Sequence, residues 1–188
     1  MASAFSHVLV AYTANKFSCD TLLNKKFFFF VAVSSIMPDI DVLAFRFGIA
    51  YGDVWGHRGM THSIFFAFIW SILLWLTLLR TADYKHFRLI SKTSLIAITI
   101  LFLSTSSHGF LDAMTNGGLG IAFFSPFNTT RYFLPWQPIQ VSPIGVSAFF
   151  SHWGLRVILS ELIWIGIPCF IVLLGIKLKN RIKNQAYK

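Results

Sequence analysis

Residues 63–79 run for seventeen positions without a charged side chain, which limits the folds open to this chain. About a quarter of the residues in a soluble domain are charged, but here the share is 12%, and hydrophobic residues make up 55%. Residues 94–111 and 157–176 are similarly apolar, and each run approaches the roughly 20 residues that a helix needs to cross a bilayer. We therefore expect an all-α, polytopic membrane helical bundle with three clear spans, in a single domain over residues 1–188.

Two shorter apolar segments precede these spans. Residues 4–15 and 27–37 are about as long as a helix but too short to cross a membrane, and Pro38 interrupts the second. We expect them to form a short N-terminal helical hairpin, because broken helices at membrane depth are tolerated where protein covers them. Residues 39–59 then read as a glycine-containing connector, and residues 116–156 as a long loop over the outer membrane face.

Most lysines and arginines fall in three segments beside the apolar runs: residues 16–26, 80–92 and the basic tail 177–188. Since basic loops stay on the cytoplasmic side, we expect a cytoplasmic C-terminus and the polar motifs at the outer face. The net charge of +9 is therefore attributed to topology and contact with lipid headgroups, not to nucleic-acid binding. The last span, residues 157–176, should kink at Pro168.

Four polar motifs collect at the expected outer level of this otherwise apolar chain. His108 and Asp112 are four residues apart and share one helical face, so both can bind one ion. Two aspartates follow Pro38, and two histidines lie in a glycine-bracketed loop. The candidate metal ligands are His7, Asp39, Asp41, His57, His62, His108 and Asp112.

Imidazole and carboxylate ligands suit zinc first, then manganese or iron. Seven candidates are too many for one tetrahedral ion, which favours two or more divalent ions within a range of one to three. Two ions about 3.5–4 Å apart suit phosphoester hydrolysis, since they activate water and stabilise charge on the phosphoryl oxygens.

Other residues are candidates for catalysis or substrate binding. Arg58 could clamp a phosphate, and Thr61 could cap a helix turn whose free N–H groups face the same anion. Arg131 is a second candidate headgroup contact, although its setting favours a structural or interfacial role. Glu161, the single acid of the last span, and Asp41 could relay a proton, although Glu161 could instead bond a neighbouring helix.

These motifs together resemble the YdjM-type family of predicted membrane-bound metal-dependent hydrolases. The resemblance covers most of residues 5–145 and rests on His7, Pro38-Asp39-Ile40-Asp41, His57-Arg58-Gly59-Met60-Thr61-His62-Ser63 and His108-Gly109-Phe110-Leu111-Asp112. It implies a protein of the bacterial inner membrane that binds metal through the seven residues named above. It also implies hydrolase activity, which has been likened to that of zinc-dependent phospholipase C.

The sequence thus predicts a membrane-embedded hydrolase that cleaves a phosphoester of a phospholipid or lipid-linked phosphate by metal-activated water. Two alternatives stay open. The same ligands could form the transit site of a metal or proton transporter, or a structural metal site in a non-catalytic membrane scaffold.

Overall fold

The computed structural model describes residues 1–186, in which helices are the only regular secondary structure. The expected all-α membrane bundle is confirmed. The helices are α1 (Ala4–Asn15), η1 (Asp20–Leu22), α2 (Lys25–Ile36), η2 (Met37–Phe47), η3 (Met60–His62), α3 (Ile64–Leu79), α4 (Lys92–Ala113), α5 (Val146–Phe149), α6 (His152–Glu161), η4 (Leu162–Gly166) and α7 (Ile167–Ala186).

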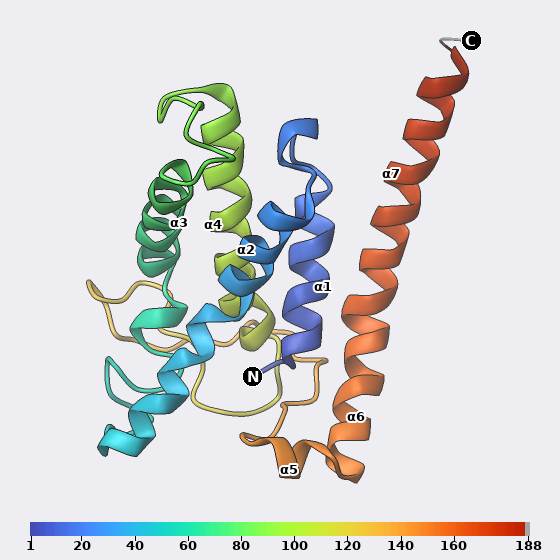
Figure 1. The fold of residues 1–188 in the computed structure, drawn as a ribbon. Helices are drawn as coiled ribbons and strands as arrows, with labels where there is room; N and C mark the ends of the chain where they lie inside the picture. The colour runs from blue at the N-terminus through green and yellow to red at the C-terminus, as the bar shows by residue number, and fades with distance from the viewer. Residues whose placement is uncertain (187–188) are drawn as a thin grey trace.

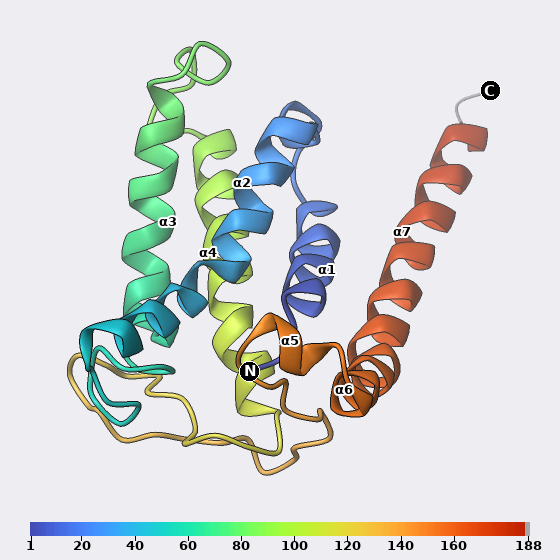
Figure 2. The same cartoon turned by 60° about the horizontal axis from the view of Figure 1, so that its bottom comes forward.

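The helices run alternately between two ends of the molecule (Figures 1 and 2). Helix α4 packs against α1, α2 and α3, while α7 stands beside α1 at the edge of the bundle. The α1–α2 turn, the α3–α4 loop and the C-terminal end of α7 lie at the upper end in Figure 1. The three basic segments therefore share one end, and η2 and the loop between α4 and α5 lie at the other.

The expected N-terminal helical hairpin is present, but its second helix is longer than the sequence indicated. Pro38 does not interrupt the chain, because the backbone tightens from α to 3-10 geometry at Met37 and continues to Phe47. A proline in the first turn of the tighter segment removes a hydrogen bond without stopping the helix. The 23 residues Lys25–Phe47 are long and apolar enough to cross a membrane, so the connector expected from residue 39 begins only after η2.

Two other helices reach spanning length, namely Lys92–Ala113 and His152–Gln185. Helix α3 is shorter than the roughly 20 residues needed, with 16 residues. The last span begins at His152, earlier than expected, and contains the π-helical segment η4, which ends two residues before Pro168. A proline cannot donate to the carbonyl four residues earlier and crowds it, which accounts for the wider turn at this position.

A core of buried, mainly apolar side chains fills the basic end of the bundle. It contains Phe27 and Val31 from α2, Trp75 from α3, and Ala97 and Leu101 from α4, all fully buried. Lys26 pairs with Asp83 across the surface of this end, and the lysine lowers the pKa of that exposed carboxyl. Among the five core side chains, the indole Nε1 of Trp75 is the only polar atom, and it has no hydrogen-bond partner.

Candidate metal centre

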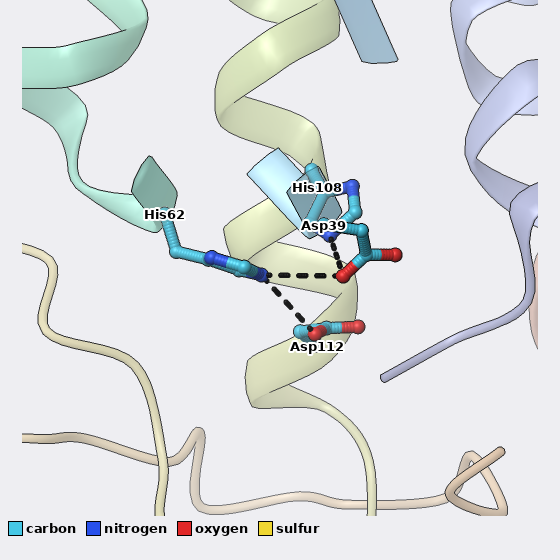
Figure 3. Close-up of side chains that lie close together, drawn as sticks. All are labelled: Asp39, His62, His108 and Asp112. Atoms are coloured by element: carbon cyan, nitrogen blue, oxygen red, sulfur yellow. Dashed lines mark ion pairs between the residues drawn. The ribbon is translucent and has the colours of Figure 1, made fainter. Parts of the chain in front are cut away.

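Four side chains from three segments converge at the end opposite the basic loops (Figure 3). Asp39 comes from η2, His62 from η3, and His108 and Asp112 from successive turns of α4. The close approach of η3 to α4 depends on Gly109, since a Cβ atom there would lie 2.8 Å from the carbonyl oxygen of His62. A residue without a side chain thus brings the two histidines together.

Three of the six distances between the four facing atoms are close to the edges of a tetrahedral coordination shell, and all four atoms lie within 4.8 Å of one another. Nε2 of His108 lies 3.2 Å from Oδ1 of Asp39, and Nε2 of His62 lies 3.6 Å from the same oxygen. Nε2 of His62 is 3.7 Å from Oδ2 of Asp112. Ligands about 2.0–2.1 Å from a tetrahedral ion stand about 3.3 Å apart, so one ion fits between them.

These facing atoms are buried and lack hydrogen-bond partners. Oδ1 of Asp39, Nε2 of His62, Nε2 of His108 and Oδ2 of Asp112 are all without one. A buried polar atom left unpaired costs about 1–3 kcal/mol, and more when it is charged. Four such atoms facing one point are therefore expensive unless a cation satisfies them together. Of these four side chains only Asp39 has exposed surface, 15%.

The opposite nitrogen of each histidine is held by contacts with protein oxygens. Nδ1 of His108 lies 2.7 Å from the backbone carbonyl oxygen of Ser35. Nδ1 of His62 lies 3.1 Å from the hydroxyl of Thr61 and 3.1 Å from Oδ2 of Asp41, with which it forms an ion-pair contact. With the proton on Nδ1, each Nε2 keeps its lone pair for a metal. Partners of this kind orient metal-binding histidines and raise their basicity.

Ser35 was not among the sequence-predicted site residues, but the sequence does contain a signal for it. In 3-10 geometry the donor to the Ser35 carbonyl would be the N–H of Pro38, which proline lacks. The carbonyl is therefore available to His108. Pro38 thus prepares the hydrogen bond that orients a candidate ligand.

Asp41 and His57 form a second group that shares His62. Asp41 already accepts hydrogen bonds through both oxygens: Oδ1 from Nδ1 of His57 at 2.7 Å, and Oδ2 from the backbone N–H of Arg58 and the hydroxyl of Thr61. The structure thus brings all seven predicted ligands to one end of the bundle, but in two different environments. The Asp39 group faces a common point with free atoms, whereas Asp41 is saturated by protein donors.

We expect Asp41→Asn to weaken metal binding by about 10- to 100-fold without removing the ion. The amide can no longer accept from every donor around it, so the tautomer of His62 is less well fixed. Competition with a chelator of known affinity measures the change, and Asp53→Asn in the exposed loop is the matched control. Complete loss of an ion would instead make Asp41 a direct ligand.

His7 adjoins the centre without belonging to the group of four. Its ring stacks on that of His108 with centroids 3.7 Å apart, and its Nε2 lies 3.7 Å from Oδ1 of Asp112. The ring is fully buried, and neither nitrogen has a hydrogen-bond partner. His7 therefore offers a further unpaired ring nitrogen beside the centre, which could bind a metal ion.

Arg58 is fully buried and turns its guanidinium toward protein groups. It donates to the carbonyl oxygen of Gly117 and to Oγ1 of Thr115, and its Nε lies 3.3 Å from Oδ2 of Asp112. Its backbone has φ of 66°, the left-handed region that side chains seldom adopt. Arg58, expected as a phosphate clamp, thus links the loop that contains His57-Arg58-Gly59 (the HRG loop) to the loop that follows α4.

Arg131 and Thr61 also bond protein groups. Arg131 donates to the carbonyl oxygens of Tyr51, Asp53 and His57, which ties the loop after α4 to the HRG loop. Burial lowers the pKa of its guanidinium. The N-cap of α3 is Ser63, not Thr61 as expected, and the hydroxyl of Thr61 donates to Asp41.

Glu161 lies away from the four converging ligands and holds the start of the chain. Its two oxygens accept from the backbone N–H and the hydroxyl of Ser3. The neighbouring N–H of Ala2 donates to Oδ1 of Asp112, which leaves Oδ2 facing the centre. The intramembrane acid is therefore placed to anchor residues 2 and 3 over Asp112.

Replacing Glu161 by leucine should lower the free energy of unfolding by about 1–3 kcal/mol, because the backbone N–H and the hydroxyl of Ser3 would both lose their acceptor. Chemical denaturation in detergent measures the loss. Ser3→Ala removes only the hydroxyl donor and should cost less. Unchanged stability together with lost turnover would favour the catalytic role that the sequence suggested.

The carboxylates favour positive charge at the centre. Burial lowers the pKa of His62, which lies just before α3, but the nearby carboxylates of Asp112, Asp39 and Asp41 raise that pKa well above the usual value for histidine. A metal cation at the same position would meet the same attraction, so it competes with a proton for the histidine.

Comparison with known proteins agrees with this membrane architecture. The family described as "YdjM inner membrane protein" matches residues 1–183. The chain belongs to this family. It is 38% identical over 141 residues to Inner membrane protein YbcI of Escherichia coli (strain K12), an alignment that covers 75% of this chain and 77% of the relative. No solved structure matches. The resemblance inferred from the motifs is confirmed, and the chain is an inner membrane protein by family.

Proposed function

We propose that this YdjM-family chain is a metal-dependent hydrolase that cleaves a phosphoester of a phospholipid or lipid-linked phosphate. The observation that carries the proposal is the convergence of four buried ligand atoms without hydrogen-bond partners, all within 4.8 Å of one another. Two imidazoles and two carboxylates suit zinc, with manganese or iron as the next choices. When bound, such an ion would activate water and polarise a phosphoryl oxygen.

The protein residues around the centre divide the remaining tasks. Asp39 carries the exposed surface of the centre, so we place the approach of substrate on its side. His7 has two free ring nitrogens beside Asp112 and is a further candidate ligand at the edge of the centre. Asp41 and Arg58 orient the centre through His62 and Asp112, and Glu161 does so through residues 2 and 3.

We infer that the basic end of the bundle is cytoplasmic and that the metal centre lies toward the outer face. Three basic segments at one end favour this orientation. A lipid substrate would then reach the centre from the outer leaflet, with its acyl chains beside the apolar helices.

A transport function is less well supported, because the buried hydroxyls between the centre and the basic end bond one another or the backbone. Between His108 and the basic end, the hydroxyls of Ser34 and Thr105 bond each other, and Ser104 donates to the carbonyl oxygen of Val31. The next layer is the hydrophobic core of the basic end, around Phe27, Trp75 and Leu101. An ion would have to cross this layer past side chains that carry no charge.

Turnover on lipid phosphoesters tests the proposal. Metal-loaded protein in detergent or vesicles is given a panel of glycerophospholipids and polyprenyl phosphates, and released headgroup or phosphate is measured. We expect turnover by the wild type, a loss of at least about 100-fold in Asp39→Asn, and retention in Asp83→Asn, which changes an exposed acid at the other end. Bound metal without turnover across the panel would leave the structural metal site of a scaffold. Equal turnover in all three proteins would overturn the assignment of the centre.

A further inference from the structure

A groove of about 470 Å³ lies between the C-terminal end of α1 and the middle of α7, at the basic end of the molecule. One wall comes from the turn after α1, with Lys16, Phe17 and Asp20. The other wall comes from α7, with Val172, Ile176 and Lys179. The groove lies at the end of the bundle opposite the metal centre and shares no residue with it.

The charged lining of the groove favours an anion. Two lysines face one aspartate there, and neither lysine forms an ion pair among residues 1–186. The ammonium of Lys16 lies over the ring of Tyr12, 4.6 Å from its centroid, which holds this charge near the groove. An anionic group would meet two ammonium donors that no protein carboxylate occupies.

The apolar lining favours a ligand with hydrocarbon chains. Phe17 is 64% exposed, and α7 presents Val172 and Ile176 to the same groove. Only 22% of the most apolar window of the last span is buried against the protein. Basic pockets between membrane helices at the cytoplasmic side bind anionic lipid headgroups. A free anion would use the lysines but not these apolar walls.

We propose that this groove binds an anionic phospholipid, whose phosphate contacts Lys16 and Lys179 and whose acyl chains lie along Val172 and Ile176. The lipid fills the space between α1 and α7 and ties the edge helix to the bundle. The site shares no residue with the metal centre, so its test does not depend on the hydrolase function.

The test compares thermal stability in nanodiscs of phosphatidylglycerol and of phosphatidylcholine, with native mass spectrometry of the lipid that stays bound. The groove variant Lys16→Ser/Lys179→Ser is matched by Lys177→Ser/Lys183→Ser, which removes the same charge from residues outside the groove. We expect phosphatidylglycerol to raise the melting temperature of the wild type and the control by several degrees. The groove variant should lose this increase and the retained lipid.

A second variant keeps all the lysines. A Cβ atom on Gly175, which lines the groove, meets nothing within 4 Å, so Gly175→Phe should fill the space for acyl chains and fold normally. It should lose the retained phosphatidylglycerol as the groove variant does. Equal lipid retention in all variants, or equal loss in the groove and control variants, would overturn the proposal. Stabilisation by inorganic phosphate that equals that by phosphatidylglycerol would show a small-anion site and also overturn it.

Discussion

Purified protein should contain about one divalent metal ion per chain, and Asp112→Ala should contain none. Oδ2 of Asp112 faces Nε2 of His62 at 3.7 Å, and its other oxygen is already used by the N–H of Ala2. Removing this carboxylate leaves three ligands and takes away a negative charge that favours the cation. Elemental analysis after purification without chelator measures the metal content.

His57→Ala is the control that distinguishes one ion from two. His57 is as buried as the ligands, but its Nδ1 bonds Asp41 rather than facing the common point. We expect this variant to keep its ion with weaker affinity. Two ions in the wild type, of which His57→Ala loses one, would contradict the single centre and restore the two-ion site that the sequence allowed.

Arg58→Ala should lower the free energy of unfolding by about 3–5 kcal/mol, even without metal or substrate. The guanidinium is fully buried and pairs with Asp112 while it bonds Gly117 and Thr115. Its removal leaves a buried carboxylate and two acceptors without their donor. Denaturation of the metal-free protein in detergent measures this loss.

Arg46→Ala, an exposed arginine on η2, should change the unfolding free energy by less than about 0.5 kcal/mol. Arg58→Lys keeps the charge but not the fork of donors, and we expect an intermediate loss. If Arg58→Ala keeps wild-type stability but loses turnover, the guanidinium binds substrate, as its place between two histidines suggested.

The difference between Arg58 as predicted and as observed has a simple physical cause. The sequence places an arginine beside two candidate ligands, but it does not contain the direction of a long side chain. That direction follows from the left-handed backbone at Arg58 and from the loop of residues 114–120, which offers carbonyl and hydroxyl acceptors. Glu161 is similar, because its partner Ser3 lies 158 residues away and no local pattern links the two.

The sequence by itself determined the class of fold and the chemistry of the site. Long uncharged runs must be helices in lipid, since no water is there to satisfy the backbone. Histidines and aspartates in so apolar a chain are costly, so their presence predicted a site. Only the tertiary structure decided which of the seven ligands share a centre. Asp39 and Asp112 meet because η2 continues past Pro38 and packs on α4, and His62 reaches them because Gly109 admits η3. A metal centre depends on positions within a few tenths of an ångström, and these come from helix packing, which spacing along the chain does not contain.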